Sequence, residues 1–203
     1  MIFTLGDIEE AKKKHEASLN MFYAVYGSDK ALHPHIATSL ARLGNIAKRQ
    51  GDLEKAKKTH EACLKMRYAI YGTDKAHPEI ATSLNILGRV LQALGDLEEA
   101  KKKHAMCLKM RYALFGADRA HHDIAESLAM RGSVSKQQGK RLLAESFFKK
   151  ALRMLLQIYG ENSSHSLILN VQKELADLVE QNKGSWSDVL AIIRKGRKGT
   201  QRD

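Results

Sequence analysis

The sequence predicts an all-α protein, a right-handed α-solenoid of helix-turn-helix repeats with a period of 44 residues. Glycine followed by aspartate occurs at Gly6, Gly51 and Gly95, and Gly139 continues the series with a lysine after it. The chain has only two prolines in 203 residues, which favours helices over loops and sheet edges. Two further series keep the same period: Gly27, Gly72, Gly116 and Gly160, and His33, His77, His121 and His165.

Each repeat is expected to contain two helices, helix A and helix B, and the unit from His77 to Gly116 illustrates both. Pro78 suits the first turn of helix A, where its missing N–H costs no hydrogen bond. An apolar stripe of helical spacing then runs from Ile80 to Leu91. Gly95 can adopt the left-handed conformation that ends a helix, so helix A is expected to end there.

Helix B of the same unit begins after Asp96, whose side chain can cap it. Glu98 and Glu99 in its first turn suit the positive end of the helix dipole. Gly88 on helix A and Ala100 on helix B are small, so the two helices are expected to pack closely.

The same pattern places helices along the whole chain. A helix B over about residues 7–25 comes first, with no helix A before it. Helix A and B pairs follow at about 34–49 with 52–70, 78–94 with 96–114, and 122–137 with 140–158, and then a helix A at about 165–181. A last helix is expected to carry Trp186 and Ile193.

These helices divide the chain into half and whole repeats. Residues 1–27 form a half repeat with helix B only, 28–72, 73–116 and 117–160 form whole repeats, 161–195 form a terminal half repeat with a capping helix, and 196–203 form a disordered basic tail. The apolar side chains Ile8, Leu19 and Phe22 have no helix A to cover them. We therefore expect a segment of a longer array, or self-association through this uncovered half repeat.

The composition excludes several classes of protein. Two cysteines cannot form a disulfide framework, and no apolar run approaches the roughly 20 residues of a transmembrane helix. The first residues do not form a signal peptide, so we expect a cytoplasmic protein. Because 34 Lys and Arg stand against 23 Asp and Glu, the formal net charge is +11. This charge leaves open a nucleic-acid or membrane binder, or a basic surface for acidic protein partners.

The residues of one repeat resemble the tetratricopeptide repeat. His77-Pro78 before helix A and Phe115-Gly116 near the end of helix B narrow the resemblance to the longer subtype of kinesin light chains and nephrocystin-3, over about residues 6–181. The resemblance implies a protein-interaction module whose helices A line a concave groove for a peptide. The pattern itself consists of Leu84, Leu87, Gly88, Leu91, Gly95, Ala100, Cys107 and Leu108.

Two departures from the family pattern stand out. The position where most tetratricopeptide repeats have a bulky aromatic residue holds His15, His60 and His104, and only Phe148 conforms. The heptad segment and motor-binding region of a complete kinesin light chain are absent, so the resemblance does not imply motor association for this chain.

The resemblance also implies which side chains would bind a peptide. An asparagine can both donate to and accept from a ligand backbone, and an arginine can bind a carboxylate with two hydrogen bonds. The basic side chains of this set favour an acidic peptide. The alternative is a solvated polar helix face without a ligand. The expected peptide-binding residues are Asn45, Lys48 and Arg49, then Asn85, Arg89 and Gln92, and then Ser133, Lys136 and Gln137.

Runs of lysine early in each helix B allow two interpretations. Lys101 to Lys103 follow Glu98 and Glu99, and such pairs stabilise a helix by roughly 0.2–0.5 kcal/mol each while its face stays solvated. The other interpretation is a ladder of basic patches for phosphates or an anionic membrane. No nucleic-acid-binding motif accompanies these lysines.

The recurring histidines and cysteines are expected to be structural. Equivalent positions of stacked repeats lie at least a helix-packing distance of about 8–10 Å apart, which is too far for one metal ion. Cys63 and Cys107 stand where other repeats have Ser18 and Ala151, which indicates a small packed residue. The chain has no phosphate-binding loop and no metalloprotease or CxxC motif.

We therefore predict a non-catalytic scaffold or adaptor that binds an acidic peptide segment in the groove. No catalytic residue, cofactor, metal or small-molecule substrate is expected, and nucleic acid and membrane are not favoured as partners. The alternative function is binding to nucleic acid or acidic lipid through the basic faces of the helices B and the C-terminal tail.

Overall fold

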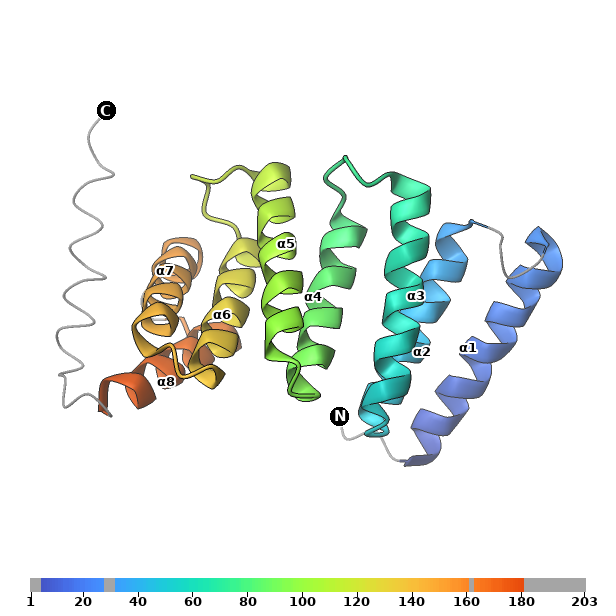
Figure 1. Cartoon of the computed structure of the whole chain (residues 1–203), viewed down its shortest axis with the longest axis horizontal. Helices are drawn as coiled ribbons and strands as arrows, with labels where there is room; N and C mark the ends of the chain where they lie inside the picture. Colours follow the sequence, from blue (N-terminus) through green and yellow to red (C-terminus); the bar gives the residue numbers. More distant parts are fainter. Residues whose placement is uncertain (1–4, 28–31, 161–162, 181–203) are drawn as a thin grey trace. The chain divides into compact units, whose positions relative to one another are not determined.

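The computed structural model describes residues 5–27, 32–160 and 163–180, which form eight α-helices and no strand (Figure 1). Every helix end lies within two residues of its predicted position. The predicted last helix with Trp186 and the predicted tail 196–203 lie outside the described residues. The helices are α1 (Leu5–Tyr26), α2 (Pro34–Arg49), α3 (Leu53–Tyr71), α4 (Pro78–Ala93), α5 (Leu97–Phe115), α6 (His122–Gln137), α7 (Arg141–Tyr159) and α8 (Ser166–Glu180).

The even-numbered helices are the helices A and the odd-numbered ones are the helices B, so the chain is an all-α solenoid of helix-turn-helix repeats. It forms two compact units, Met1–Cys107 and Leu108–Asp203, whose boundary falls inside α5. In the first unit α1 packs on α2, α2 on α3 and α3 on α4. In the second unit α6 packs on α7, and α7 on α8.

The histidine series caps the helices A. The Nδ1 atoms of His77 and His121 accept a hydrogen bond from the backbone N–H two residues later, over 3.2 Å in both cases. The ring of His77 stacks on Tyr71, with 3.6 Å between ring centroids, and His121 stacks on Phe115 at the same distance. The prediction that these histidines serve loop or capping geometry is confirmed, and each one also ties helix A to the end of the preceding helix B.

The turns between helices A and B end as predicted. Gly51 and Gly95 have φ angles of +83° and +85°, in the left-handed region that favours glycine. Asp52 then caps α3 by accepting a hydrogen bond from the N–H of Lys55 over 3.0 Å. In the fourth turn, Lys140 takes this N-cap position on α7 without a side-chain hydrogen bond.

Helix A and helix B of one repeat pack closely through a glycine. A Cβ atom built on Gly44 would lie 2.6 Å from the Nε2 atom of His60, and one on Gly88 would lie 2.7 Å from the Cε1 atom of His104. Gly132 faces Phe148 in the same way. The recurring histidines are therefore packing residues, as predicted, at the position of the family's bulky aromatic.

Candidate functional site

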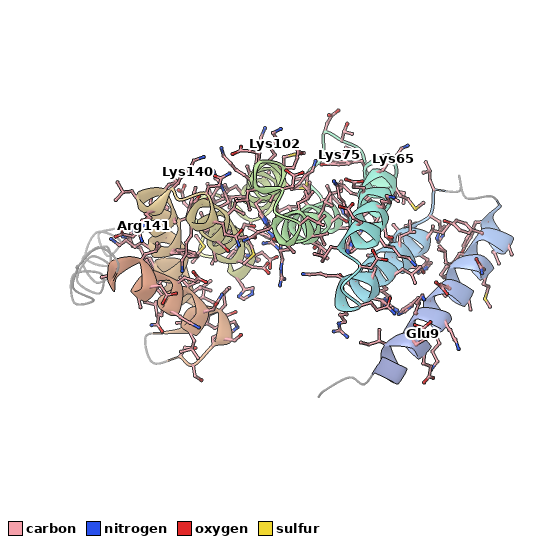
Figure 2. The ribbon with its side chains drawn as sticks, turned by 60° about the horizontal axis from the view of Figure 1, so that its bottom comes forward. Glu9, Lys65, Lys75, Lys102, Lys140 and Arg141 are labelled. Carbon is pink, nitrogen blue, oxygen red and sulfur yellow. The ribbon has the colours of Figure 1, made fainter. Side chains whose placement is uncertain are left out.

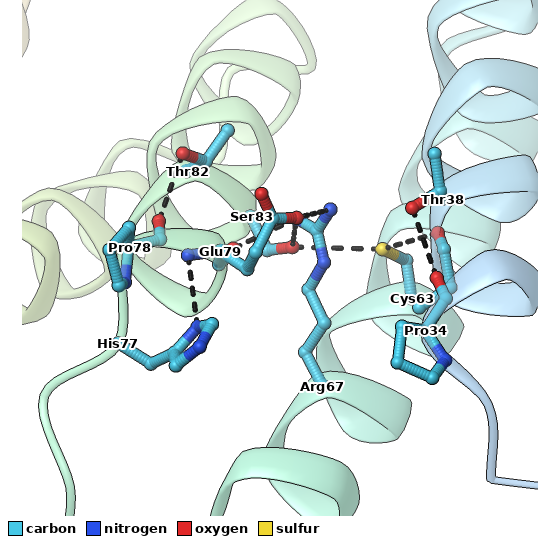
Figure 3. Close-up of polar contacts among 10 residues, drawn as sticks. Pro34, Thr38, Cys63, Arg67, His77, Pro78, Glu79, Thr82 and Ser83 are labelled. Atoms are coloured by element: carbon cyan, nitrogen blue, oxygen red, sulfur yellow. Dashed lines mark hydrogen bonds and ion pairs between the residues drawn. The ribbon is translucent and has the colours of Figure 1, made fainter.

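A buried arginine positions neighbouring helices A in the first unit. Arg67 on α3 is 5% exposed, and its Nη1 atom donates to the hydroxyl of Ser83 over 2.6 Å and to the carbonyl of Glu79 over 2.8 Å (Figure 3). Its Nη2 atom forms an ion pair with the Glu79 carboxylate. On the other side, the Cys63 thiol donates to the carbonyl of Ala37 on α2 over 3.1 Å. Helix α3 is thus bonded to the helix A before it and to the one after it.

The second unit repeats this network. Arg111 on α5 donates to the hydroxyl of Ser127 over 2.7 Å and to the Glu126 carboxylate over 3.0 Å, both on α6. Sequence reasoning missed this pair of arginines. The signal was present, because Arg67 and Arg111, like Ser83 and Ser127, are 44 residues apart.

The predicted peptide-binding residues of the first unit differ in exposure. Asn45 and Arg49 on α2 and Arg89 on α4 are exposed, while Lys48 and Gln92 are half-buried. Asn85 is only 5% exposed. The structure therefore presents the basic members of the set to solvent and leaves little of the Asn85 amide for a ligand.

Three of these residues meet at an open cavity of about 470 Å³ between α1 and α2. Its wall is basic on the α2 side and has no acidic residue. The residues that line it are Ala11, His15, Arg42, Asn45, Ile46, Lys48 and Arg49.

Positive charges crowd this surface. Partial burial, and then the nearby charge of Arg89, lower the pKa of Lys48 below its ordinary value. Burial and the charge of Arg42 lower the pKa of His15 in the same way. Among the described residues, no carboxylate forms an ion pair with Lys48 or Arg89. The arrangement can therefore take up negative charge.

The equivalent lysine of the second unit is already neutralised. Lys136 on α6 donates to Glu174 over 2.8 Å and to Asp177 over 3.2 Å, both on α8. Burial lowers the pKa of Lys136, but the hydrogen bonds to the two carboxylates outweigh it, so its pKa is raised. The other predicted residues of this unit are half-buried Ser133 and exposed Gln137.

The repeat register explains the contrast. Lys48 lies two repeats before Lys136, and Arg89 lies two repeats before Asp177. The first unit therefore has an arginine where the second has the carboxylate that binds the lysine.

Many lysines of the helices B have acidic partners within their own helix. Lys102 bonds to Glu99 over 2.6 Å, and Lys14 to Glu10 over 2.6 Å. The side chain of Lys102 extends into solvent from α5 (Figure 2). These pairs agree with the interpretation of a solvated, self-paired face.

Other kinds of site have little support in the parts of the chain that the structure describes. No group of three potential ligands that could hold a metal ion occurs there. Cys63 and Cys107 are buried, and burial raises the pKa of the Cys63 thiol, which disfavours a thiolate nucleophile. None of the described helices is long and apolar enough to cross a membrane.

Comparisons with known proteins identify relatives of this architecture. A family model described as tetratricopeptide repeat matches residues 35–113 and 79–157. Among curated proteins, no sequence matches significantly.

Solved structures match over nearly the whole chain. A putative kinesin light chain with nearly identical TPR-like repeats from Podosopora anserina is 20% identical, with a TM-score of 0.70 over 98% of this chain and 90% of that one. BtubC (BKLC) from P. vanneervenii is 17% identical, with a TM-score of 0.77 over 98% of this chain and 77% of that one. A tetratricopeptide repeat protein from Parabacteroides merdae is 21% identical, with a TM-score of 0.52 over 95% and 65%. At these identities the likeness concerns the fold.

Proposed function

Because the chain belongs to the tetratricopeptide repeat family, we propose that it is a non-catalytic adaptor that binds an acidic peptide segment of a protein partner on α2 and α4. The fold suggests a protein-protein interaction scaffold, since stacked repeats present extended surfaces to partners. The peptide, its acidity and its place on the helices A are the added content of the proposal.

The observation that carries the proposal is the contrast between two lysines at the same repeat position. Lys136 binds two carboxylates from α8, whereas Lys48 lies beside Arg89 and its pKa is lowered. A carboxylate placed between Lys48 and Arg89 would relieve this repulsion and gain charge-assisted hydrogen bonds. An acidic peptide would thus supply in the first unit what α8 supplies in the second.

The neighbouring side chains suit the rest of such a ligand. Asn45 and Arg49 are exposed on α2, where an amide can bond to a peptide backbone and a guanidinium can bind a second carboxylate. Gln92 and the small exposed part of Asn85 extend the polar surface on α4. Ser133, Lys136 and Gln137 are a secondary surface in the second unit.

The test is a fluorescence anisotropy titration with a labelled peptide of Asp and Glu residues around one apolar anchor. The double variant Lys48→Gln with Arg89→Gln is expected to bind at least about tenfold more weakly, because a hydrogen bond to a charged group contributes about 1.5–3 kcal/mol. The matched control, Lys65→Gln with Lys102→Gln, removes the same charge from exposed positions on helices B (Figure 2). Equal affinity of the two double variants would refute the assignment.

The same variants separate the alternative function. Binding to nucleic acid or anionic lipid through the helix B faces predicts that the Lys65 and Lys102 variant loses more affinity than the Lys48 and Arg89 variant. Titration with a DNA duplex and with vesicles of acidic lipid would measure this. Stronger loss in the helix B variant would favour the alternative.

A further inference from the structure

The face that every other helix B turns toward its own helix A is only partly covered on α1. On α3, α5 and α7 the side chains of this face are at most 1% exposed. On α1 the equivalent Ala11, His15 and Ser18 are half-buried. The residues of the covered faces are Ala56, His60 and Cys63, then Ala100, His104 and Cys107, and then Ala144, Phe148 and Ala151.

The cavity of about 470 Å³ lies beside this uncovered face. One repeat later, Ala47 of helix A, Ala56 of helix B and Val90 of the next helix A form one buried cluster. Ala11 and Ile46, the equivalents of Ala56 and Val90, both line the cavity. The equivalent of Ala47 is the missing member, so the cavity marks the place of a helix A.

Helix α8 carries a helix A face that remains open. Leu169 is 53% exposed, although its equivalents Ala37, Ala81 and Ala125 on the other helices A are buried. Ala176 occupies the position of Gly44, Gly88 and Gly132, so α8 has a small residue where a helix A meets the ring on helix B.

The charges of the two surfaces are complementary. The cavity is lined by Arg42, Lys48 and Arg49 and by no acidic residue. The segment of α8 has one lysine and three acidic residues: Lys173, and Glu174, Asp177 and Glu180.

We propose that the chain self-associates head to tail, with α8 of one copy docking as a helix A on α1 of the next copy. The interface completes a repeat: Ala176 of one copy lies against His15 of the other, as Gly44 lies against His60. The hydroxyl of Ser18 faces the carbonyl of Leu169, as the Cys63 thiol faces that of Ala37. The proposal is independent of the peptide site, since His15, Ser18 and Leu169 are not among the predicted peptide-binding residues.

A head-to-tail contact uses two different surfaces, so it adds copies without closing into a symmetric dimer. Analytical ultracentrifugation of the full chain, from micromolar to near-millimolar concentration, should show an average mass that rises steadily above the monomer mass of 22.7 kDa. His15→Arg on α1 and Leu169→Glu on α8 should each reduce it to the monomer mass. The controls Glu16→Arg and Asn170→Glu change neighbouring exposed residues and should leave the association intact.

Mixing the two defective variants gives the sharpest test. The His15→Arg protein keeps a sound α8, and the Leu169→Glu protein keeps a sound α1, so an equimolar mixture should form a dimer that does not grow further. A symmetric contact through α1 alone would not produce this complementation, and that result would overturn the proposal. A wild-type chain that stays monomeric throughout, or one whose association survives Leu169→Glu, would overturn it as well.

A disulfide experiment does not depend on variants that weaken the fold. A Ser18→Cys protein mixed with a Leu169→Cys protein should form an intermolecular disulfide under mild oxidation, because the equivalent side chains of the internal repeats are in contact. The native Cys63 and Cys107 are buried and should not react. A Ser18→Cys protein mixed with a Lys150→Cys protein, substituted on an exposed position of α7, is the matched control. Equal cross-linking in both mixtures would contradict the proposed contact.

Discussion

The Nε2 atom of His60 lies 2.6 Å from the position that a Cβ atom on Gly44 would occupy. The histidine ring therefore rests directly on the backbone of the facing helix, and His60 itself is 1% exposed. The same relationship joins Gly88 to His104 and Gly132 to Phe148. The close approach of helix A to helix B depends on the absence of a side chain at this glycine.

Gly44→Ala should destabilise the protein by about 1–3 kcal/mol, because the added methyl group overlaps a rigid buried ring. Alanine in a helix interior otherwise gains roughly 0.5–1 kcal/mol over glycine, so the sign of the change is informative. Urea denaturation followed by circular dichroism measures it. The double variant Gly44→Ala with His60→Ala should recover part of the loss, and a more stable Gly44→Ala single variant would show that the ring moves freely.

The buried His60 should make stability depend on pH. Burial, with Lys48 and Arg67 nearby, lowers the pKa of His60 from 6.5 to about 4 in the folded protein. The unfolded chain therefore binds the proton more tightly. Its contribution to stability is complete above about pH 6.5 and is lost as the pH falls toward 4, by on the order of 3 kcal/mol.

His60→Phe should remove this contribution without opening a cavity, because Phe148 already fits against Gly132 at the same repeat position. Urea denaturation of both proteins between pH 4 and pH 7 gives the difference in free energy of unfolding. The gap should shift in favour of the variant as the pH falls. A gap that does not change with pH would exclude His60 as a source of acid sensitivity.

Arg67→Leu should destabilise the protein by about 1–3 kcal/mol, because it leaves the buried hydroxyl of Ser83 without its guanidinium donor. The chain contains its own apolar version of this pair. Leu155 and Val171 stand at the positions of Arg67 and Ser83 two repeats later, and both are completely buried. The double variant Arg67→Leu with Ser83→Val should therefore recover most of the loss. A double variant that is less stable than either single variant would show that the polar network cannot be exchanged.

Lys140→Asp should stabilise the protein by roughly 0.5–1 kcal/mol, because Lys140 is an N-cap without a side-chain hydrogen bond. Asp52 at the same position of α3 bonds to the N–H of Lys55. Thermal denaturation measures the change, with Lys140→Ala as the control that removes the lysine without adding a cap. Equal melting temperatures of the two variants would argue against capping.

The positions of the helices could be predicted because their signals are local. Pro78 and Gly95 restrict the backbone at the ends of α4, and the apolar stripe between them has helical spacing. The exposure of the expected site residues was less predictable. Asn85 and Lys48 were assigned to the same surface from their repeat positions, but one is buried and the other is half-buried. Side-chain exposure depends on the neighbouring helices, which repeat position does not specify.

By itself, the sequence determined the repeat, its period, the helix ends and the glycine between each pair of helices, since each follows from backbone preference or periodic burial. Only the tertiary structure decided which charges meet. Lys136 and Asp177 are 41 residues apart and form an ion pair, while their counterparts Lys48 and Arg89 repel each other. A charge acquires its meaning from partners within a few ångströms, and those partners come from distant segments that only packing brings together.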